Sequence, residues 1–170
     1  AFLVQLKEKN IIDIHDIEKF IGKILFLIKN NISRTNIYDT LSGIHSAVIY
    51  YYGRYKIDGN AREIIKLIIE LFKNNFDMTF MRKNFNFASF AHGYSGVLTS
   101  AMCMYKIEKS SKTKFLISEL FRAEEALHES GFLWRDMRRK EQQYSHYWCH
   151  GSLGIMYSRL IWRMLNLTDG

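Results

Sequence analysis

The stretch Ala91-His92-Gly93-Tyr94-Ser95-Gly96 decides the fold, because related stretches open two other segments of the chain. Leu41-Ser42-Gly43-Ile44 lies 50 residues earlier, and Cys149-His150-Gly151-Ser152-Leu153-Gly154 comes later. Each stretch precedes an apolar run, and self-similarity of this kind is the signature of repeated supersecondary units. The sequence therefore predicts a recurring unit with three helix starts, near Gly43, Gly93 and Gly151.

Each unit is predicted to contain two unlike helices. The run 44–52 is apolar nearly all round, and the run 97–104 is rich in small and apolar residues, which is typical of enclosed helices. The second helix of each unit is amphipathic, and a further amphipathic segment spans 17–31. The predicted apolar stripes are Ala61, Ile64, Ile65, Ile68 and Leu71 in one unit, and Leu116, Leu120, Ala123 and Leu127 in the next, where Ser111 is the expected N-cap.

Alternation of enclosed and half-exposed helices predicts an inner and an outer ring. We therefore expect one all-α domain over residues 1–170, an α/α toroid of which about half is present, with an open helical solenoid as the structural alternative. Parallel inner helices would gather their N-termini at one end, where free N–H groups and partial positive charge collect. The residues just before these helices, Asp39, His92 and Cys149, would then face one cavity.

The composition narrows the class of protein. Proline is absent, which suits long helices, and the net charge of +7 comes from Lys and Arg scattered along the chain without a DNA-reading pattern. We expect no nucleic-acid partner. No apolar run reaches about 18 residues, so no membrane span is predicted. The two cysteines, Cys103 and Cys149, form no disulfide framework, which favours a reducing compartment such as the cytoplasm.

Four motifs together resemble the lanthionine synthetase C-like cyclases. Ser89-Phe90-Ala91-His92-Gly93-Tyr94-Ser95-Gly96 and Tyr147-Trp148-Cys149-His150-Gly151-Ser152-Leu153-Gly154-Ile155 look like the two leading signatures of that family. Tyr38-Asp39-Thr40-Leu41-Ser42-Gly43 is similar to an earlier signature. Trp134-Arg135-Asp136-Met137-Arg138 resembles the cyclase half of bifunctional class II lanthipeptide synthetases. The resemblance covers most of residues 36 to 165.

The resemblance implies a zinc ion held by two cysteines and one histidine, with a fourth position open for substrate. Cys149 matches the first cysteine ligand, and the other two ligands belong to a later Cys-His-Gly signature expected beyond Gly170. Cys103 is no substitute, because it lies mid-helix in a Met- and Ala-rich run where a free cysteine packs as a small hydrophobe. The 170 residues alone are therefore expected to bind zinc poorly or not at all.

The resemblance also implies catalytic roles. His92 matches the signature histidine that acts on the α-carbon proton, and Asp39 matches an acidic residue near the site. From their positions alone, His92 would serve as well to bond a backbone group at a helix start, and Asp39 to cap a helix. The residues expected to line the pocket are Gly93, Gly96, Trp148, His150 and Gly151.

The implied activity is addition of peptide cysteine thiols to dehydroalanine or dehydrobutyrine, giving lanthionine or methyllanthionine rings. The implied partner is a dehydrated, ribosomally made precursor peptide, together with a dehydratase domain or the rest of the toroid. Two alternatives stay open: a non-catalytic, peptide-binding toroid, and a glutathione-binding relative of the same family. The segment Asp136-Met137-Arg138 argues against the second.

Overall fold

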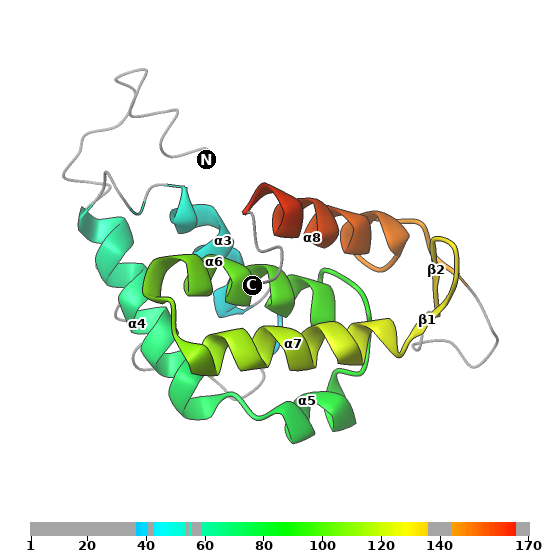
Figure 1. Ribbon diagram of the computed structural model, residues 1–170, viewed down its shortest axis with the longest axis horizontal. Helices are drawn as coiled ribbons and strands as arrows, with labels where there is room; N and C mark the ends of the chain where they lie inside the picture. The colour runs from blue at the N-terminus through cyan, green and yellow to red at the C-terminus, as the bar shows by residue number, and fades with distance from the viewer. Residues whose placement is uncertain (1–36, 41–42, 54, 56–58, 136–143, 166–170) are drawn as a thin grey trace, which may run out of the picture.

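The computed structural model describes residues 37–40, 43–53, 55, 59–135 and 144–165 (Figure 1). In these ranges the regular secondary structure is helical apart from one antiparallel two-stranded hairpin at the edge of the molecule, so the all-α prediction is confirmed. The helices are α3 (Ile44–Tyr52), α4 (Gly59–Asn75), α5 (Met78–Asn84), α6 (Tyr94–Glu108), α7 (Ser111–Glu125) and α8 (Ser152–Met164), and the strands are β1 (His128–Ser130) and β2 (Leu133–Trp134).

The central helix is α6, which packs against α3, α7 and α8. In turn, α3 packs against α4. The helices α3, α6 and α8 therefore form a row, while α4 and α7 cover the outer sides of α3 and α6 (Figure 1). This is the pairing of inner and outer helices that the repeat predicts.

Burial follows the predicted contrast between the two kinds of helix. On α6 every residue from Tyr94 to Met104 is buried. On α3 only Ile44, His45 and Val48 are buried, so that helix is less enclosed than its composition predicts. His45 is a core residue: its Nε2 lies 2.7 Å from the carbonyl oxygen of Ile37, and burial lowers its pKa to about 4.

The amphipathic helices are confirmed with two corrections in α7. Its N-cap is Ser110, whose hydroxyl accepts from the N–H of Thr113, and the predicted cap Ser111 is the first helical residue. The buried stripe of α7 is also rotated from the prediction, because Leu116, Ala123 and Leu127 are only half-buried. The residues buried there are Thr113, Ile117, Leu120 and Glu124. On α4 the predicted stripe holds except at half-buried Leu71, and Ile69 and Phe72 extend it.

All three predicted helix starts are confirmed, with Gly43, Gly93 and Gly151 as the N-caps of α3, α6 and α8. Before two of these helices the chain folds back on itself. The N–H of Tyr94 donates to the carbonyl of Phe87 at 2.8 Å, and the N–H of Ser152 donates to that of Ser145 at 2.9 Å.

The fold-back explains the capping glycines. A Cβ added at Gly93 would lie 2.1 Å from the carbonyl oxygen of Phe87, and one at Gly151 would lie 1.9 Å from that of Ser145. These distances are shorter than any non-bonded contact, so only glycine fits. The backbone that comes so close to each glycine belongs to the loop just before the helix.

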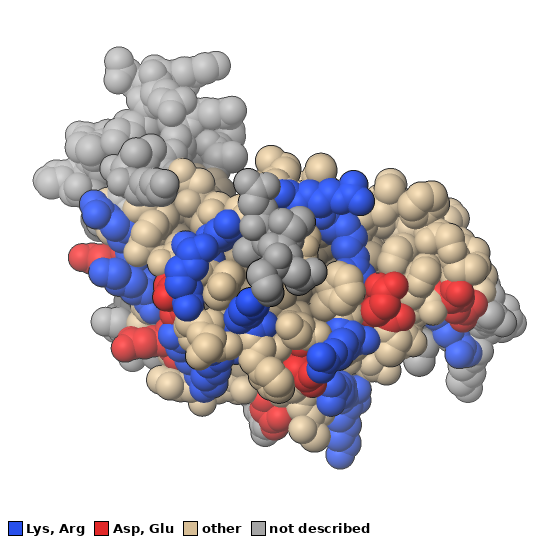
Figure 2. All heavy atoms as spheres, in the orientation of Figure 1, with Lys and Arg blue, Asp and Glu red and all other residues tan. Residues whose placement is uncertain are grey.

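Two features of the sequence analysis concern the rest of the chain. The amphipathic segment 17–31 and the segment Asp136-Met137-Arg138 lie outside the described residues. Among the described helices, none is both long and apolar enough to cross a membrane. Lys and Arg side chains are spread over several helices of the face in Figure 2, with Asp and Glu between them, as the scattered charges of the sequence predict.

We predict that Gly96→Ala destabilises the protein while Gly59→Ala does not. A Cβ at Gly96 would lie 2.0 Å from Thr40 Oγ1 and 2.1 Å from the Phe90 carbonyl oxygen, whereas nothing lies within 4 Å of a Cβ at Gly59. Overpacking of this kind costs about 1–3 kcal/mol, so the urea midpoint should fall. Equal midpoints for the two variants would contradict the close approach at Gly96.

Candidate functional site

Two backbone hydrogen bonds join the three repeated motifs. The N–H of Thr40 donates to the carbonyl of Ala91 at 3.0 Å, and the N–H of Ala91 donates to the carbonyl of Cys149 at 2.9 Å. Ala91 therefore lies between the residues that flank Asp39 and those that flank His150. This linkage holds three segments, far apart in sequence, at one end of the row of inner helices.

Asp39 is fixed by its neighbour Tyr38. The ring of Tyr38 is fully buried against Phe76, Phe80 and Phe85, with centroids 4.9–5.5 Å apart. Its hydroxyl accepts from the N–H of Asp77 at 2.9 Å. Since Tyr38 is anchored at both the ring and the hydroxyl, the backbone of Asp39 is held in place although no regular element contains it.

His92 is held by Asp39. The Nδ1 of His92 lies 2.5 Å from Oδ2 of Asp39, and the side chains are 37% and 12% exposed respectively. A carboxylate oxygen only accepts, so Nδ1 carries the proton of this bond. The other ring nitrogen, Nε2, is then the lone-pair acceptor in the neutral ring and an N–H acid in the protonated ring. Because His92 is partly exposed, Nε2 can exchange a proton with a molecule bound beside it.

His150 lies flat against His92. The ring centroids are 5.3 Å apart and the ring planes differ by 21°. This stacking and the bond between Ala91 and Cys149 make His92 and Cys149 close neighbours, well inside the separation of about two helix diameters expected for a shared cavity. The structure thus brings Asp39, His92, Cys149 and His150 together.

The other predicted pocket residues have different surroundings. Gly93, Gly96 and Gly151 are buried against backbone and against Thr40, so they shape the loops. Trp148 packs on Phe90 with centroids 4.7 Å apart and lines a separate groove beside α8.

A buried carboxyl behind the site was not foreseen. Glu124 of α7 is fully buried, its Oε1 contacts the hydroxyl of Ser95, and its Oε2 forms an ion pair with Arg159 of α8. Ser95 also donates to the carbonyl of Ala88 at 2.5 Å, within the loop that precedes α6. Burial raises the pKa of Glu124 to about 7, although the charge of Arg159 opposes the shift. The signal available in the sequence was Glu124 in helical phase with Ile117 and Leu120.

A complete metal site is absent from the described ranges. They contain no group of three or more His, Cys, Asp or Glu side chains that could hold a metal ion. Cys149 is half-buried, whereas burial raises the pKa of the Cys103 thiol to about 12. Of the two thiols, Cys149 is therefore the candidate ligand, and the described residues do not complete the three-ligand set that a catalytic zinc needs.

Comparison with known proteins agrees with this arrangement. Residues 1–168 match the protein family described as lanthionine synthetase C-like protein. The chain belongs to the lanthionine synthetase C-like family. This membership implies that the row of paired helices belongs to an α/α toroid.

One known protein is similar to part of the chain. The chain is 37% identical over 82 residues to a protein of Lactococcus lactis subsp. lactis described as a lacticin 481/lactococcin biosynthesis protein. That match covers 48% of this chain and 9% of the relative's length. No solved structure matches the chain significantly.

We predict that Glu124 makes stability depend on pH. Its pKa is about 7 when folded, against an ordinary value of 4.5, so the folded state keeps a proton that the unfolded chain loses. The contribution of Glu124 to stability is therefore full below about pH 4.5, falls between pH 4.5 and 7, and is constant above that. Relative to the parent protein, Glu124→Gln should become more favourable as pH rises through this window.

Urea unfolding at pH 5 and pH 8 measures this difference. Glu119→Gln, on the same helix beside Arg82 and Arg122, controls for the loss of a carboxylate from α7. An identical effect of Glu124→Gln at both pH values, or a change of the opposite sign, would contradict the raised pKa.

Proposed function

We propose that the protein takes part in lanthionine formation, as the cyclase that adds peptide cysteine thiols to dehydroalanine or dehydrobutyrine. The observation that carries the proposal is the hydrogen-bonded pair of Asp39 and His92, held beside Cys149 by the backbone of Ala91. Family membership supports it, as does the relative described as a lacticin 481/lactococcin biosynthesis protein.

The reaction needs a proton at a defined place. The thiolate sulfur forms a bond to the β-carbon of the dehydro residue, and the double-bond electrons move toward the α-carbon as an enolate. The enolate is then protonated at the α-carbon, which balances the proton lost by the thiol. Protonated His92 donates this proton from Nε2 while Asp39 accepts from Nδ1 and stabilises the charged ring.

Two contacts orient the ring of His92. Asp39 fixes one edge through the hydrogen bond, and His150 covers one face. With its edge and one face constrained, the ring presents Nε2 in a narrow range of directions. A fixed donor direction suits proton delivery to one face of the enolate, and hence one configuration at the α-carbon.

Zinc is the cofactor of the proposed cyclase, with Cys149 as one ligand and the other ligands outside the described residues. When bound, zinc would supply coordination that lowers the pKa of the substrate thiol. The residues described here contribute one sulfur to that site.

The proposed substrate is a ribosomally made precursor peptide that a dehydratase has already acted on, in the cytoplasm. Dehydroalanine and dehydrobutyrine arise by loss of water from Ser and Thr, so dehydration must come first. A dehydratase domain or enzyme is therefore the expected partner of the proposed cyclase.

The second candidate is a peptide-binding member of the family without catalysis. It is favoured by one observation, that no three-ligand metal group occurs among the described residues. The Asp39–His92 pair favours the enzyme, because a binding module has no need of an oriented proton donor.

We predict that His92→Asn in the full-length protein lowers the rate of ring formation by about 100-fold or more, since general acid catalysis is lost. Ring formation is followed by mass spectrometry after alkylation of unreacted cysteines. His128→Asn is the matched control, because His128 lies on β1 and bonds the carbonyl of Gly131 away from the site. Full activity of His92→Asn would refute the assigned role.

A further prediction concerns the metal. Elemental analysis of the full-length protein should find one zinc, and Cys149→Ala should remove it because a catalytic site with two protein ligands holds zinc weakly. Cys103→Ala should keep the zinc, since Cys103 is buried in α6. Zinc retained at full occupancy in Cys149→Ala would exclude Cys149 as a ligand.

A further inference from the structure

The hydroxyl of Ser95 lies between two oxygen atoms and has a hydrogen for only one of them. Its Oγ is 2.5 Å from the carbonyl oxygen of Ala88 and is also in contact with Oε1 of Glu124. A serine hydroxyl carries one hydrogen, and neither a carbonyl nor an ionised carboxylate has one to donate. Two hydrogen bonds at Ser95 therefore need a second hydrogen, which a protonated Glu124 supplies. The carboxylic acid then donates to Ser95, and Ser95 donates to Ala88.

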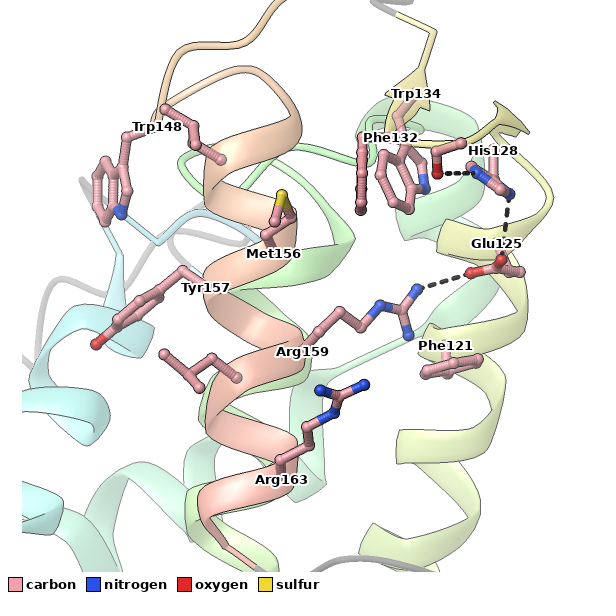
Figure 3. Close-up of a pocket in the computed structure, with 13 residues that line it drawn as sticks. Phe121, Glu125, His128, Phe132, Trp134, Trp148, Met156, Tyr157, Arg159 and Arg163 are labelled. Carbon is pink, nitrogen blue, oxygen red and sulfur yellow. Dashed lines mark hydrogen bonds and ion pairs between the residues drawn. The ribbon is translucent and has the colours of Figure 1, made fainter.

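The charge of Arg159 does not require an ionised Glu124. Arg159 Nη2 lies 2.7 Å from Oε2 of Glu125, and its guanidinium lies 3.8 Å from the ring centre of Phe121 (Figure 3). The Glu125 side chain is 45% exposed, so water also solvates its charge. Glu124 is fully buried between neutral Ser95 on α6 and Arg159 on α8. Burial and the neighbouring Glu125 raise the pKa of Glu124 to about 7, which agrees with the hydrogen count.

This chain of hydrogen bonds ends on the loop of residues 88–95, which contains His92. The N–H of Ser95 also donates to the carbonyl of Ala88, but at 3.3 Å, so the hydroxyl makes the closer contact across the base of the loop. The ring of His92 is bonded to Asp39, which lies outside the loop. A change in the separation of Ala88 and Ser95 therefore moves the backbone of His92 relative to Asp39.

We propose that Glu124 is a positioning residue for His92, and that it acts as a neutral carboxylic acid whose hydrogen bond to Ser95 keeps the His92 loop closed at Ala88. When Glu124 ionises, one of the two hydrogens at Ser95 is lost. The hydroxyl then turns to the carboxylate, since a charged acceptor forms a hydrogen bond about twice as strong as a neutral one. The loop opens at Ala88. The role in catalysis rests on the proposed function of His92, whereas the closure of the loop does not.

Amide hydrogen exchange of residues 87–95 measures the closure of the loop. In the parent protein, protection corrected for intrinsic exchange should fall about tenfold between pH 6 and pH 8, because the ionised fraction of a group with this pKa rises from about one tenth to about nine tenths. Glu124→Gln should keep the same protection at both pH values, since its amide N–H donates to Ser95 throughout. Helix α4 is the internal control. Equal protection of the loop in the parent protein at pH 6 and pH 8 would overturn the proposal.

The rate of ring formation against pH tests the role in catalysis. The rate of Glu124→Gln divided by that of the parent protein should rise about tenfold from pH 6 to pH 8, because only the parent loses its neutral acid. Any pH dependence of His92 is present in both proteins and cancels in this ratio. When both proteins also carry Ser95→Ala, the ratio should stay constant, because the connection to the loop is gone.

Ser158→Ala is the matched control for Ser95→Ala. Ser158 of α8 is also fully buried, and it accepts from Thr99 of α6 at 2.9 Å, one helical turn beyond Ser95. When both proteins carry Ser158→Ala, the ratio should still rise with pH. A constant ratio without these serine substitutions, or an equal rise in the Ser95→Ala background, would overturn the proposal. Absence of ring formation at every pH would refute the proposed function alone, and hydrogen exchange would still decide whether Glu124 closes the loop.

Discussion

The rest of the structure depends on two backbone hydrogen bonds of Ala91. It accepts from Thr40 and donates to Cys149, so one residue connects all three repeated motifs. A backbone hydrogen bond requires approach to about 2.9 Å, which is possible here only because the neighbouring glycines carry no Cβ. The fold and the candidate site therefore have the same origin, the close packing of loops ahead of the inner helices.

The close packing of these loops also determines the electrostatic potential at the candidate site. The helices α3, α6 and α8 begin at glycines, which have no side chain to cap the helix, and the positive ends of the three helix dipoles lie at the same end as Asp39, His92 and Cys149. In the proposed reaction, a positive potential there stabilises the thiolate and the enolate. Behind the loops, Glu124 connects α6, α7 and α8 through Ser95 and Arg159.

The sequence predicted those features that repeat. Gly43, Gly93 and Gly151 occur in similar contexts, and each caps a helix. Features that occur once were missed: the seven-residue helix α5, the β1–β2 hairpin, and the burial of Glu124. A short helix has too few residues for periodicity to show. The burial of Glu124 depends on its partner Arg159, which lies 35 residues away in the sequence and comes close only in the folded chain.

Diffraction from crystals of the full-length protein, recorded on both sides of the zinc absorption edge, tests the central claim most directly. The claim is that the three loops joined by Ala91 form one zinc-dependent catalytic site. The account predicts a single anomalous peak about 2.3 Å from Sγ of Cys149, with Nε2 of His92 facing the same cavity and Nδ1 on Asp39. A peak remote from Cys149, or a His92 ring turned away from that cavity, would contradict it.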